Sequence, residues 1–369
     1  MASRPDAGAP APMASPDPTL IHVPGDALRR FVSTTLQRVG LPPADADVVA
    51  GLMAEADLQG SDGHGVIRLL PYARRIRAGG INLNPEIKVV QERPGMALLD
   101  GDNGMGHLVM HKAAELAIEK ARTCGIGWVG SRMSNHAGPA SLYARMAMAH
   151  DMIGLYFAVG NANHLPPWGG LDMLLSTNPI AVALPAGEEP PVVLDMATTV
   201  AAYGKVKAKA QRGEQMPVGW MIDRLGQPLT DPKRAEEGFL MPIGGYKGYG
   251  LALIVGLLAG TLNGAAMGQE VVDFNHDDTT TTNTGQAILA IDLSAFGDVA
   301  GFKARVDRLV RELRASERMP GVERIWLPGE QSHERRATNE RDGIPIGATL
   351  LVQLDQFAGE MGIARLQDT

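Results

Sequence analysis

Two hydrophobic patterns succeed one another along this chain of 369 residues. Up to about residue 80, apolar residues recur at the spacing that indicates amphipathic helices. From about residue 95, short apolar runs bounded by Gly, Asn and Asp indicate strands, and further helical segments separate them. The order of these patterns predicts a mixed α/β fold that begins with a helical part.

The expected helices begin and end at residues that commonly flank helices. Asp26 is placed to cap a first helix that ends before Gly40, a second follows the proline pair at 42–43, and a third spans about 65–77. Strands are expected at 96–99, 127–131, 153–159, 180–184, 192–195 and 287–291, and further helices at 107–122, 139–150, 246–262, 299–315 and 346–361.

Composition narrows the class of protein. With a net charge of −7 and no run of Lys or Arg longer than a pair, the chain is not expected to bind nucleic acid. Its single cysteine, Cys124, cannot form an intramolecular disulfide, which fits a reducing cytoplasm. The longest apolar stretch, 251–262, is too short to cross a membrane. The Ala/Pro-rich residues 1–18 lack the apolar core of a signal peptide and are expected to form a disordered tail.

The segment 61–68 carries the most informative pair of side chains. His64 and Arg68 are four residues apart, so on a helix they share a face. Arg68 offers a planar fork that matches a carboxylate, and a histidine can give up a proton near neutral pH. This pair suits a 2-oxo acid. The alternative is structural, with His64 capping a helix and Arg68 paired with a surface carboxylate.

Two further polar residues follow expected strands. His136, in the segment 134–138, precedes an expected helix and is a candidate second acid, base or orienting group, or else a polar loop histidine. Asp195 ends a buried strand and enters a run of small residues, where it could tune a histidine or cap the next helix.

A glycine-rich segment, 244–250, opens the apolar helix expected at 246–262. Its backbone N–H groups and Lys247 could hold phosphates, or the glycines could form a tight turn packed on that helix. A Rossmann fingerprint is not supported, because the third glycine after Gly104 and Gly106 would fall at Val109. No metal site is predicted, since the His107 and His111 pair has no third ligand nearby.

Taken together, these segments resemble the malate/L-lactate dehydrogenase family, which includes ureidoglycolate, sulfolactate, 2,3-diketogulonate and piperideine-2-carboxylate oxidoreductases. That family is distinct from the Rossmann-fold lactate dehydrogenases. The resemblance covers roughly residues 20 to 365. It runs, in the family's order, through DGHGVIRLLPYARRIRAGGIN, DGDNGMGH, SNHAGPASLYA, STNPIAVALP, LDMATT, GGYKGYGLAL and LPGE.

The resemblance implies an α/β, mixed-sheet, non-Rossmann fold that binds nicotinamide cofactors, NAD or NADP, in a homodimer. In it a helical part, 19–92 packing with 320–369, would serve substrate and dimer contacts beside a cofactor part at 93–319. The implied function is hydride transfer between NAD(P)H and a small 2-oxo acid or 2-hydroxy acid. The alternatives are a reductase of cyclic or N-methyl imino acids and a non-catalytic relative that binds the cofactor.

Site residues follow from the same resemblance, position by position. His64 matches a proton donor, His136 an acid/base, and Arg68 the arginine that holds the substrate carboxylate. Gly63 replaces the Ser or Thr usual in the family, so Ser61 is the candidate replacement hydroxyl. The full expected set comprises His64, His136 and Asp195 as catalytic; Arg68, Ser61 and Tyr72 as substrate-binding; and Asp195, Met196, Ala197, Thr198, Tyr246, Lys247, Pro328, Gly329 and Glu330 as cofactor-binding.

The segment 161–168 and Gly256 also depart from the family pattern. The loop at 161–168 lacks the usual Thr-Asn sequence, and Gly256 stands where an acid is common. Both departures bear on which substrate is bound.

Overall fold

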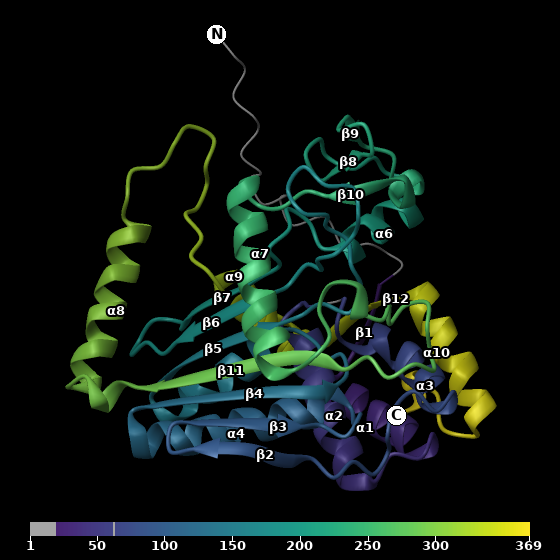
Figure 1. The fold of residues 1–369 in the computed structure, drawn as a ribbon, viewed down its shortest axis with the longest axis horizontal. Coiled ribbons are helices and arrows are strands. Elements are labelled where there is room, and N and C mark those ends of the chain that lie inside the picture. The colour runs from purple at the N-terminus through teal and green to yellow at the C-terminus, as the bar shows by residue number, and fades with distance from the viewer. Residues whose placement is uncertain (1–19, 62) are drawn as a thin grey trace.

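A seven-stranded mixed sheet forms the centre of the computed structural model, which describes residues 20–61 and 63–369 (Figure 1). The strand order is β2-β3-β4-β11-β5-β6-β7, and β3 with β4 is the parallel pair within it. The strands are β2 (Lys88–Arg93), β3 (Met96–Asp100), β4 (Ile126–Ser134), β5 (Met152–Ala158), β6 (Ile180–Leu184), β7 (Val192–Met196) and β11 (Thr284–Asp292). The mostly antiparallel pairing excludes a Rossmann sheet, as predicted.

Helices cover both faces of this sheet because successive side chains of a strand point to opposite sides. Ala287 packs toward α7 (Tyr246–Ala259), whereas the next residue, Ile288, belongs to the core formed with α4 (Gly106–Cys124) and α5 (Ser141–Met146). Figure 1 shows α7 crossing in front of the sheet. At Gly154 a Cβ would lie 2.0 Å from the carbonyl oxygen of Ala144, so glycine permits the close approach of α5 to β5.

The first helices share one hydrophobic cluster with the end of the chain. This unit contains α1 (Gly25–Arg38), α2 (Pro43–Leu58), the 3-10 segment η1 (Val66–Arg68), α3 (Leu69–Arg77) and α10 (Ala348–Met361), and β1 (Leu20–Val23) pairs with β12 (Ile344–Gly347). The amide of Asn339, in α9 (Glu330–Asp342), donates to the carbonyl oxygen of Leu58 at 3.0 Å, which ties α9 to the end of α2.

A smaller unit projects from the sheet beside α7. It consists of α6 (Tyr203–Arg212) and a three-stranded sheet of β8 (Met221–Asp223), β9 (Pro228–Leu229) and β10 (Gly238–Leu240), with its own small core. The helix α8 (Val299–Arg314) flanks the other end of the large sheet (Figure 1). No helix formed by residues 20–61 and 63–369 has the length and apolar character needed to cross a membrane.

The expected strands and most expected helices are present, with three corrections. Asp26 is not the cap of α1, because Pro24 holds that position and Asp26 pairs with Arg30 at 2.7 Å inside the first turn. His64 and Arg68 do not share an α-helix, since His64 lies in a turn and Arg68 ends η1. The last long helix begins at Ala348 rather than 346, because the preceding residues pair with β1. The predicted tail, 1–18, lies outside the described residues.

Candidate active site

His136 follows β4 in a segment fixed by the buried amide of Asn135. The Asn135 side chain accepts from the hydroxyl of Thr282 at 3.2 Å and donates to the carbonyl oxygen of Gly104 at 2.9 Å. Gln286 donates to the backbone oxygen of Asn135 at 2.9 Å. A buried polar group that is satisfied on several sides is held rigidly. His136 therefore projects from a fixed support.

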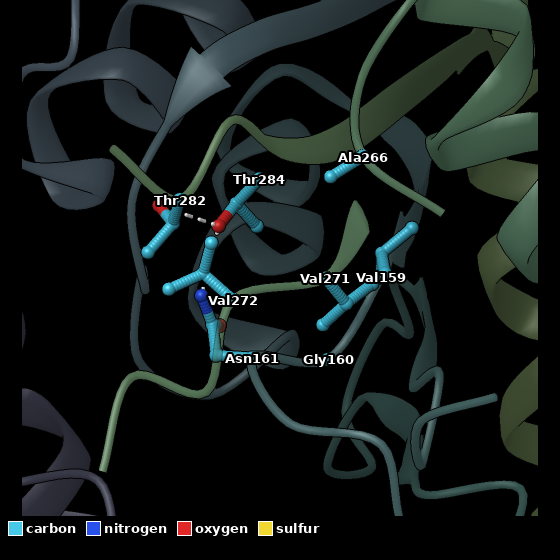
Figure 2. A pocket seen from close by; sticks show the side chains of 8 residues that line it. All are labelled: Val159, Gly160, Asn161, Ala266, Val271, Val272, Thr282 and Thr284. Carbon is cyan, nitrogen blue, oxygen red and sulfur yellow. Dashed lines mark hydrogen bonds between the residues drawn. The ribbon is translucent and has the colours of Figure 1, made fainter. Parts of the chain in front are cut away.

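The neighbouring side chain of Thr284 extends this polar support. Its hydroxyl donates to that of Thr282 at 3.1 Å, and the amide of Asn161 donates to Thr284 at 2.8 Å. Figure 2 shows the three side chains lining a narrow crevice next to Gly160 and Val272. Asn161 belongs to the loop that departs from the family pattern, so this loop contacts the support of His136.

His64 is held in the turn between α2 and η1. The carboxylate of Asp57 accepts from the N–H of Val66 at 2.7 Å, and a Cβ on Gly65 would lie 1.9 Å from that carboxylate, so only glycine fits there. The N–H of His64 donates to the carbonyl oxygen of Ser61 at 2.8 Å. The His64 ring then lies nearly parallel to that of His136, with centroids 5.5 Å apart and an interplanar angle of 11°.

Tyr72 determines how the His136 ring is oriented. Its hydroxyl lies 2.5 Å from Nδ1 of His136, and the N–H of Gly138 donates to the same nitrogen at 3.4 Å. Burial raises the pKa of Tyr72, so the phenol stays protonated. Because a backbone N–H can only donate, Nδ1 is an acceptor and the proton of neutral His136 is on Nε2. The predicted direct contact of Tyr72 with substrate stays a prediction.

Arg68 lies beside both histidines and shapes their electrostatics. Its Nε donates to the carbonyl oxygen of Gly63 at 2.8 Å, and its side chain is half-buried. Desolvation first, and the Arg68 charge second, lower the pKa of His64 to about 4 and that of His136 well below its ordinary value. Both rings are therefore neutral at neutral pH while no anion lies beside Arg68.

A third histidine lies beneath this pair. His107 is fully buried, both of its ring nitrogens lack a hydrogen-bond partner among the described residues, and its ring meets Tyr72 edge-on at 5.5 Å. Burial lowers the pKa of His107 to about 3. His111 points elsewhere and lies 3.6 Å from the carboxylate of Glu115. Within residues 20–61 and 63–369 no cluster of side chains suited to a metal ion is found.

Asp195 lies near the end of β7, and its hydrogen-bond partner is a helix terminus. Its carboxylate accepts from the N–H of Ser141, the first residue of α5, at 2.8 Å. The prediction that it tunes a histidine therefore has no support from its contacts. The alternative, a cap for the helix that follows Asp195, is wrong, because Ala202 precedes that helix and Asp195 bonds to α5 instead. The side chain is exposed, yet surrounding protein raises the pKa of its carboxyl.

The predicted cofactor segments 196–198 and 246–247 lie next to each other. The carbonyl oxygen of Thr198 accepts from the N–H of Ile243 at 3.0 Å, immediately before the turn that opens α7. In that turn Gly244 and Gly245 adopt φ values of +59° and +67°, which favour glycine. Tyr246 and Lys247 follow as exposed residues at the start of α7.

The third predicted cofactor segment, 328–330, lies on the free edge of β7. The N–H of Val193 donates to the carbonyl oxygen of Pro328 at 3.0 Å, and a Cβ on Gly329 would lie 2.8 Å from the carbonyl oxygen of Val193. The buried carboxylate of Glu330 pairs with Arg314 of α8. Three segments that are far apart in the sequence therefore border β7.

Comparison with known proteins identifies the family. The family model for malate/L-lactate dehydrogenase matches residues 23–355. The chain belongs to the malate/L-lactate dehydrogenase family. This confirms the resemblance and the non-Rossmann α/β fold.

Individual members of the malate/L-lactate dehydrogenase family match over nearly their whole length. Malate dehydrogenase of Pyrococcus abyssi is 39% identical over 95% of this chain and 98% of its own. The pyrroline-2-carboxylate/piperideine-2-carboxylate reductase of Pseudomonas putida is 32% identical over 92% and 98%. The structure of malate dehydrogenase from Pyrococcus horikoshii superposes with a TM-score of 0.87 at 36% identity, covering 96% of this chain and 99% of that one.

Sequence reasoning missed two residues of this candidate site. Arg75 is three residues after Tyr72 on α3, and its buried guanidinium donates to the Asn135 side chain at 3.3 Å. The i, i+3 spacing places Tyr72 and Arg75 on one helix face, and this spacing could have indicated Arg75 as a site residue. Phe274 packs on His136 from a loop, and no local pattern indicates such a contact.

Proposed function

We propose that this chain transfers a hydride between NAD(P)H and a small 2-oxo acid or its 2-hydroxy counterpart. The observation that carries the proposal is the parallel pair of His64 and His136 beside Arg68. It combines a cation for a carboxylate with two groups able to bond a carbonyl oxygen. The printed activities of the relatives, malate dehydrogenase among them, support the same reaction class.

The segments around β7 fit a dinucleotide. Asp195 offers an exposed carboxylate, and the left-handed glycines before Tyr246 and Lys247 lie at a helix start, where backbone N–H groups can bind phosphate. When bound, NAD or NADP supplies the hydride. We propose that residues 195–198, 246–247 and 328–329 hold it, with Glu330 acting through its ion pair with Arg314.

The substrate carboxylate would pair with the terminal nitrogens of Arg68. The negative charge of the carboxylate offsets the positive charge of the Arg68 guanidinium. This raises the pKa of His64 from about 4 and favours the protonated form of His64. His64 then gives its proton to the carbonyl oxygen, and in the oxidative direction it takes the proton back. His136 donates a hydrogen bond from Nε2 to the same oxygen and keeps its proton.

We also propose that Ser61 supplies a hydroxyl near the substrate, in place of the one missing at Gly63. Its backbone oxygen already holds the turn that carries His64, and its side chain is half-buried. This places Ser61 next to the proposed proton donor.

A second candidate is the reduction of a cyclic or N-methyl imino acid. Both histidines are neutral at neutral pH, and a protonated imine needs no further proton from the site. The named activity of the Pseudomonas putida relative favours this candidate. A non-catalytic protein that binds the cofactor is the remaining alternative, and it requires that no oxo or imino acid is turned over.

We further propose a cytoplasmic homodimer. The helix α7 is apolar on all sides after Lys247, yet Ile254 is 54% exposed and Leu257 40%. A helix that is apolar all round is normally buried, so a second copy of the chain is the expected cover. We also propose two parts of the chain: a helical part, 19–92 with 320–369, and a cofactor part, 93–319. The proposal rests on the one hydrophobic cluster that contains residues from both ends of the chain.

The test follows absorbance of NADH, and separately of NADPH, with pyruvate, oxaloacetate and a cyclic imino acid. Consumption with a 2-oxo acid supports the main proposal and identifies the preferred cofactor. Consumption with the imino acid alone selects the second candidate. Cofactor binding without consumption across the panel contradicts both.

A further inference from the structure

Phe274 contacts His136 and Tyr72 from a loop that no motif marks. The residue lies between η5 (Gly268–Glu270) and β11 and is 3% exposed. Its ring centroid lies 5.8 Å from that of His136, at an interplanar angle of 32°, and 5.8 Å from that of Tyr72. Phe274 is therefore an apolar side chain in direct contact with His136, the residue proposed to bind the carbonyl oxygen of the substrate.

The loop that carries Phe274 is fixed to α3. Arg75 donates to the carbonyl oxygens of Asp277 and Thr280, and its guanidinium carbon lies 5.3 Å from the centroid of the Phe274 ring. The N–H of Phe274 donates to the carbonyl oxygen of Asn161 at 2.9 Å. These contacts hold both ends of the loop segment, so the ring has a fixed position.

The Asp277 carboxylate stiffens the same loop from inside. It accepts from the N–H groups of Thr279 and Thr280 at 2.9 and 2.8 Å. The loop also approaches α3 so closely that a Cβ on Gly80 would lie 2.2 Å from the carbonyl oxygen of Asp278. Phe274 therefore belongs to a loop that hydrogen bonds and close packing on α3 hold in place.

We propose that Phe274 determines substrate specificity by limiting the size of the group attached to the 2-oxo carbon. The proposal rests on the proposed function. Arg68 would fix the carboxylate, and the two histidines the carbonyl oxygen, so the attached group is the part of a 2-oxo acid still free to vary. In the proposed arrangement that group would lie against Phe274, which packs against His136 and is held in place by the guanidinium of Arg75.

The test compares pyruvate with 2-oxopentanoate in the whole enzyme and in two variants. Phe274→Ala is expected to raise kcat/KM for 2-oxopentanoate relative to pyruvate at least tenfold, because one or two methylenes in an apolar pocket change kcat/KM by about that factor. Phe274→Leu is expected to fall between Phe274→Ala and the unmodified enzyme. The control is Phe296→Ala, at a side chain that is 82% exposed, where the ratio should not change.

A binding measurement separates this proposal from the proposed reaction. Dissociation constants are measured for oxamate and N-ethyloxamate, unreactive amides with the shapes of a short and a longer 2-oxo acid. The proposal expects Phe274→Ala to favour N-ethyloxamate relative to oxamate at least tenfold. If no 2-oxo acid is turned over, the proposed function fails, and this binding ratio still decides the role of Phe274. A ratio that changes less than tenfold in a folded Phe274→Ala overturns the proposal.

Discussion

The hydroxyl of Tyr72 lies 2.5 Å from Nδ1 of His136, and the N–H of Gly138 approaches the same nitrogen. Two donors at one ring nitrogen leave the proton of neutral His136 on Nε2. In this arrangement Nε2 of His136 carries the proton and can donate a hydrogen bond to a bound ligand. Because Tyr72 is buried, we propose that it acts through His136.

Replacing Tyr72 by Phe leaves the more distant N–H of Gly138 as the donor to Nδ1, and should therefore weaken the preference of His136 for the Nε2–H tautomer. We expect kcat to fall about tenfold, because a lost hydrogen bond to a buried ring nitrogen costs about 1–3 kcal/mol. Nitrogen NMR of labelled histidine should show a larger fraction of the Nδ1–H tautomer of His136. Tyr203→Phe, in the small α6 unit, is the matched control and should change neither quantity. An unchanged tautomer in Tyr72→Phe would contradict this role.

His64→Asn tests the proposed proton donor. Positioned acid/base catalysis supplies about 10²- to 10⁴-fold, so kcat should fall within that range while cofactor affinity stays the same. Steady-state kinetics and a cofactor titration by fluorescence measure the two quantities. Near-native turnover in the variant would transfer the role to His136.

Arg68→Lys keeps the charge and removes the planar fork. We expect KM for the 2-oxo acid to rise roughly tenfold or more, since hydrogen bonds to charged groups contribute about 1.5–3 kcal/mol. Arg74→Lys is the control on the adjacent helix, where the arginine pairs with Asp278 at the surface. Equal KM values for Arg68→Lys and the control would show that Arg68 does not bind the carboxylate.

The buried His107 predicts a dependence of stability on pH. Its pKa is about 3 in the folded protein and near the ordinary value in the unfolded chain, so the unfolded chain binds more protons between these values. The free energy of unfolding that depends on neutral His107 has its full value above the pKa of His107 in the unfolded chain, and it decreases as the pH falls below that pKa. At pH 5 the loss is about 2 kcal/mol for this group.

His107→Leu should remove that loss. Denaturant titrations at pH 7 and pH 5 should show a smaller decrease in unfolding free energy for His107→Leu than for the unmodified protein. His111→Leu, one helical turn later and half-exposed, serves as the control. Equal pH dependence in His107→Leu and the unmodified protein would rule out the buried neutral ring as its source.

The strands that sequence analysis found are those with buried apolar runs, such as β6 and β11. It missed β2, whose residues are all exposed, and α9, whose sequence EQSHERRATNERD has no apolar stripe. Hydrophobic periodicity carries no signal for such elements. The helix start at Asp26 was wrong because a proline two residues earlier already sets the cap geometry.

For the candidate site, the sequence pointed to His64, Arg68 and His136, which the structure brings together, but it misjudged how the first two are held. The spacing of His64 and Arg68 suggested a helix face, whereas the Asp57 carboxylate holds a turn there. The contact of Tyr72 with His136 joins residues 64 positions apart, and that of Phe274 with His136 depends on a distant loop. Such contacts arise from the tertiary fold and leave no local pattern.

The most direct test of the central claim uses NADH or NADPH deuterated at the transferable position, with pyruvate and a panel of larger 2-oxo acids. The product is analysed by mass spectrometry and NMR. Our account predicts deuterium on carbon 2 of the 2-hydroxy acid, and loss of that label in His64→Asn and Arg68→Lys in proportion to their kcat/KM. A folded enzyme that binds cofactor yet labels no 2-oxo acid would contradict it.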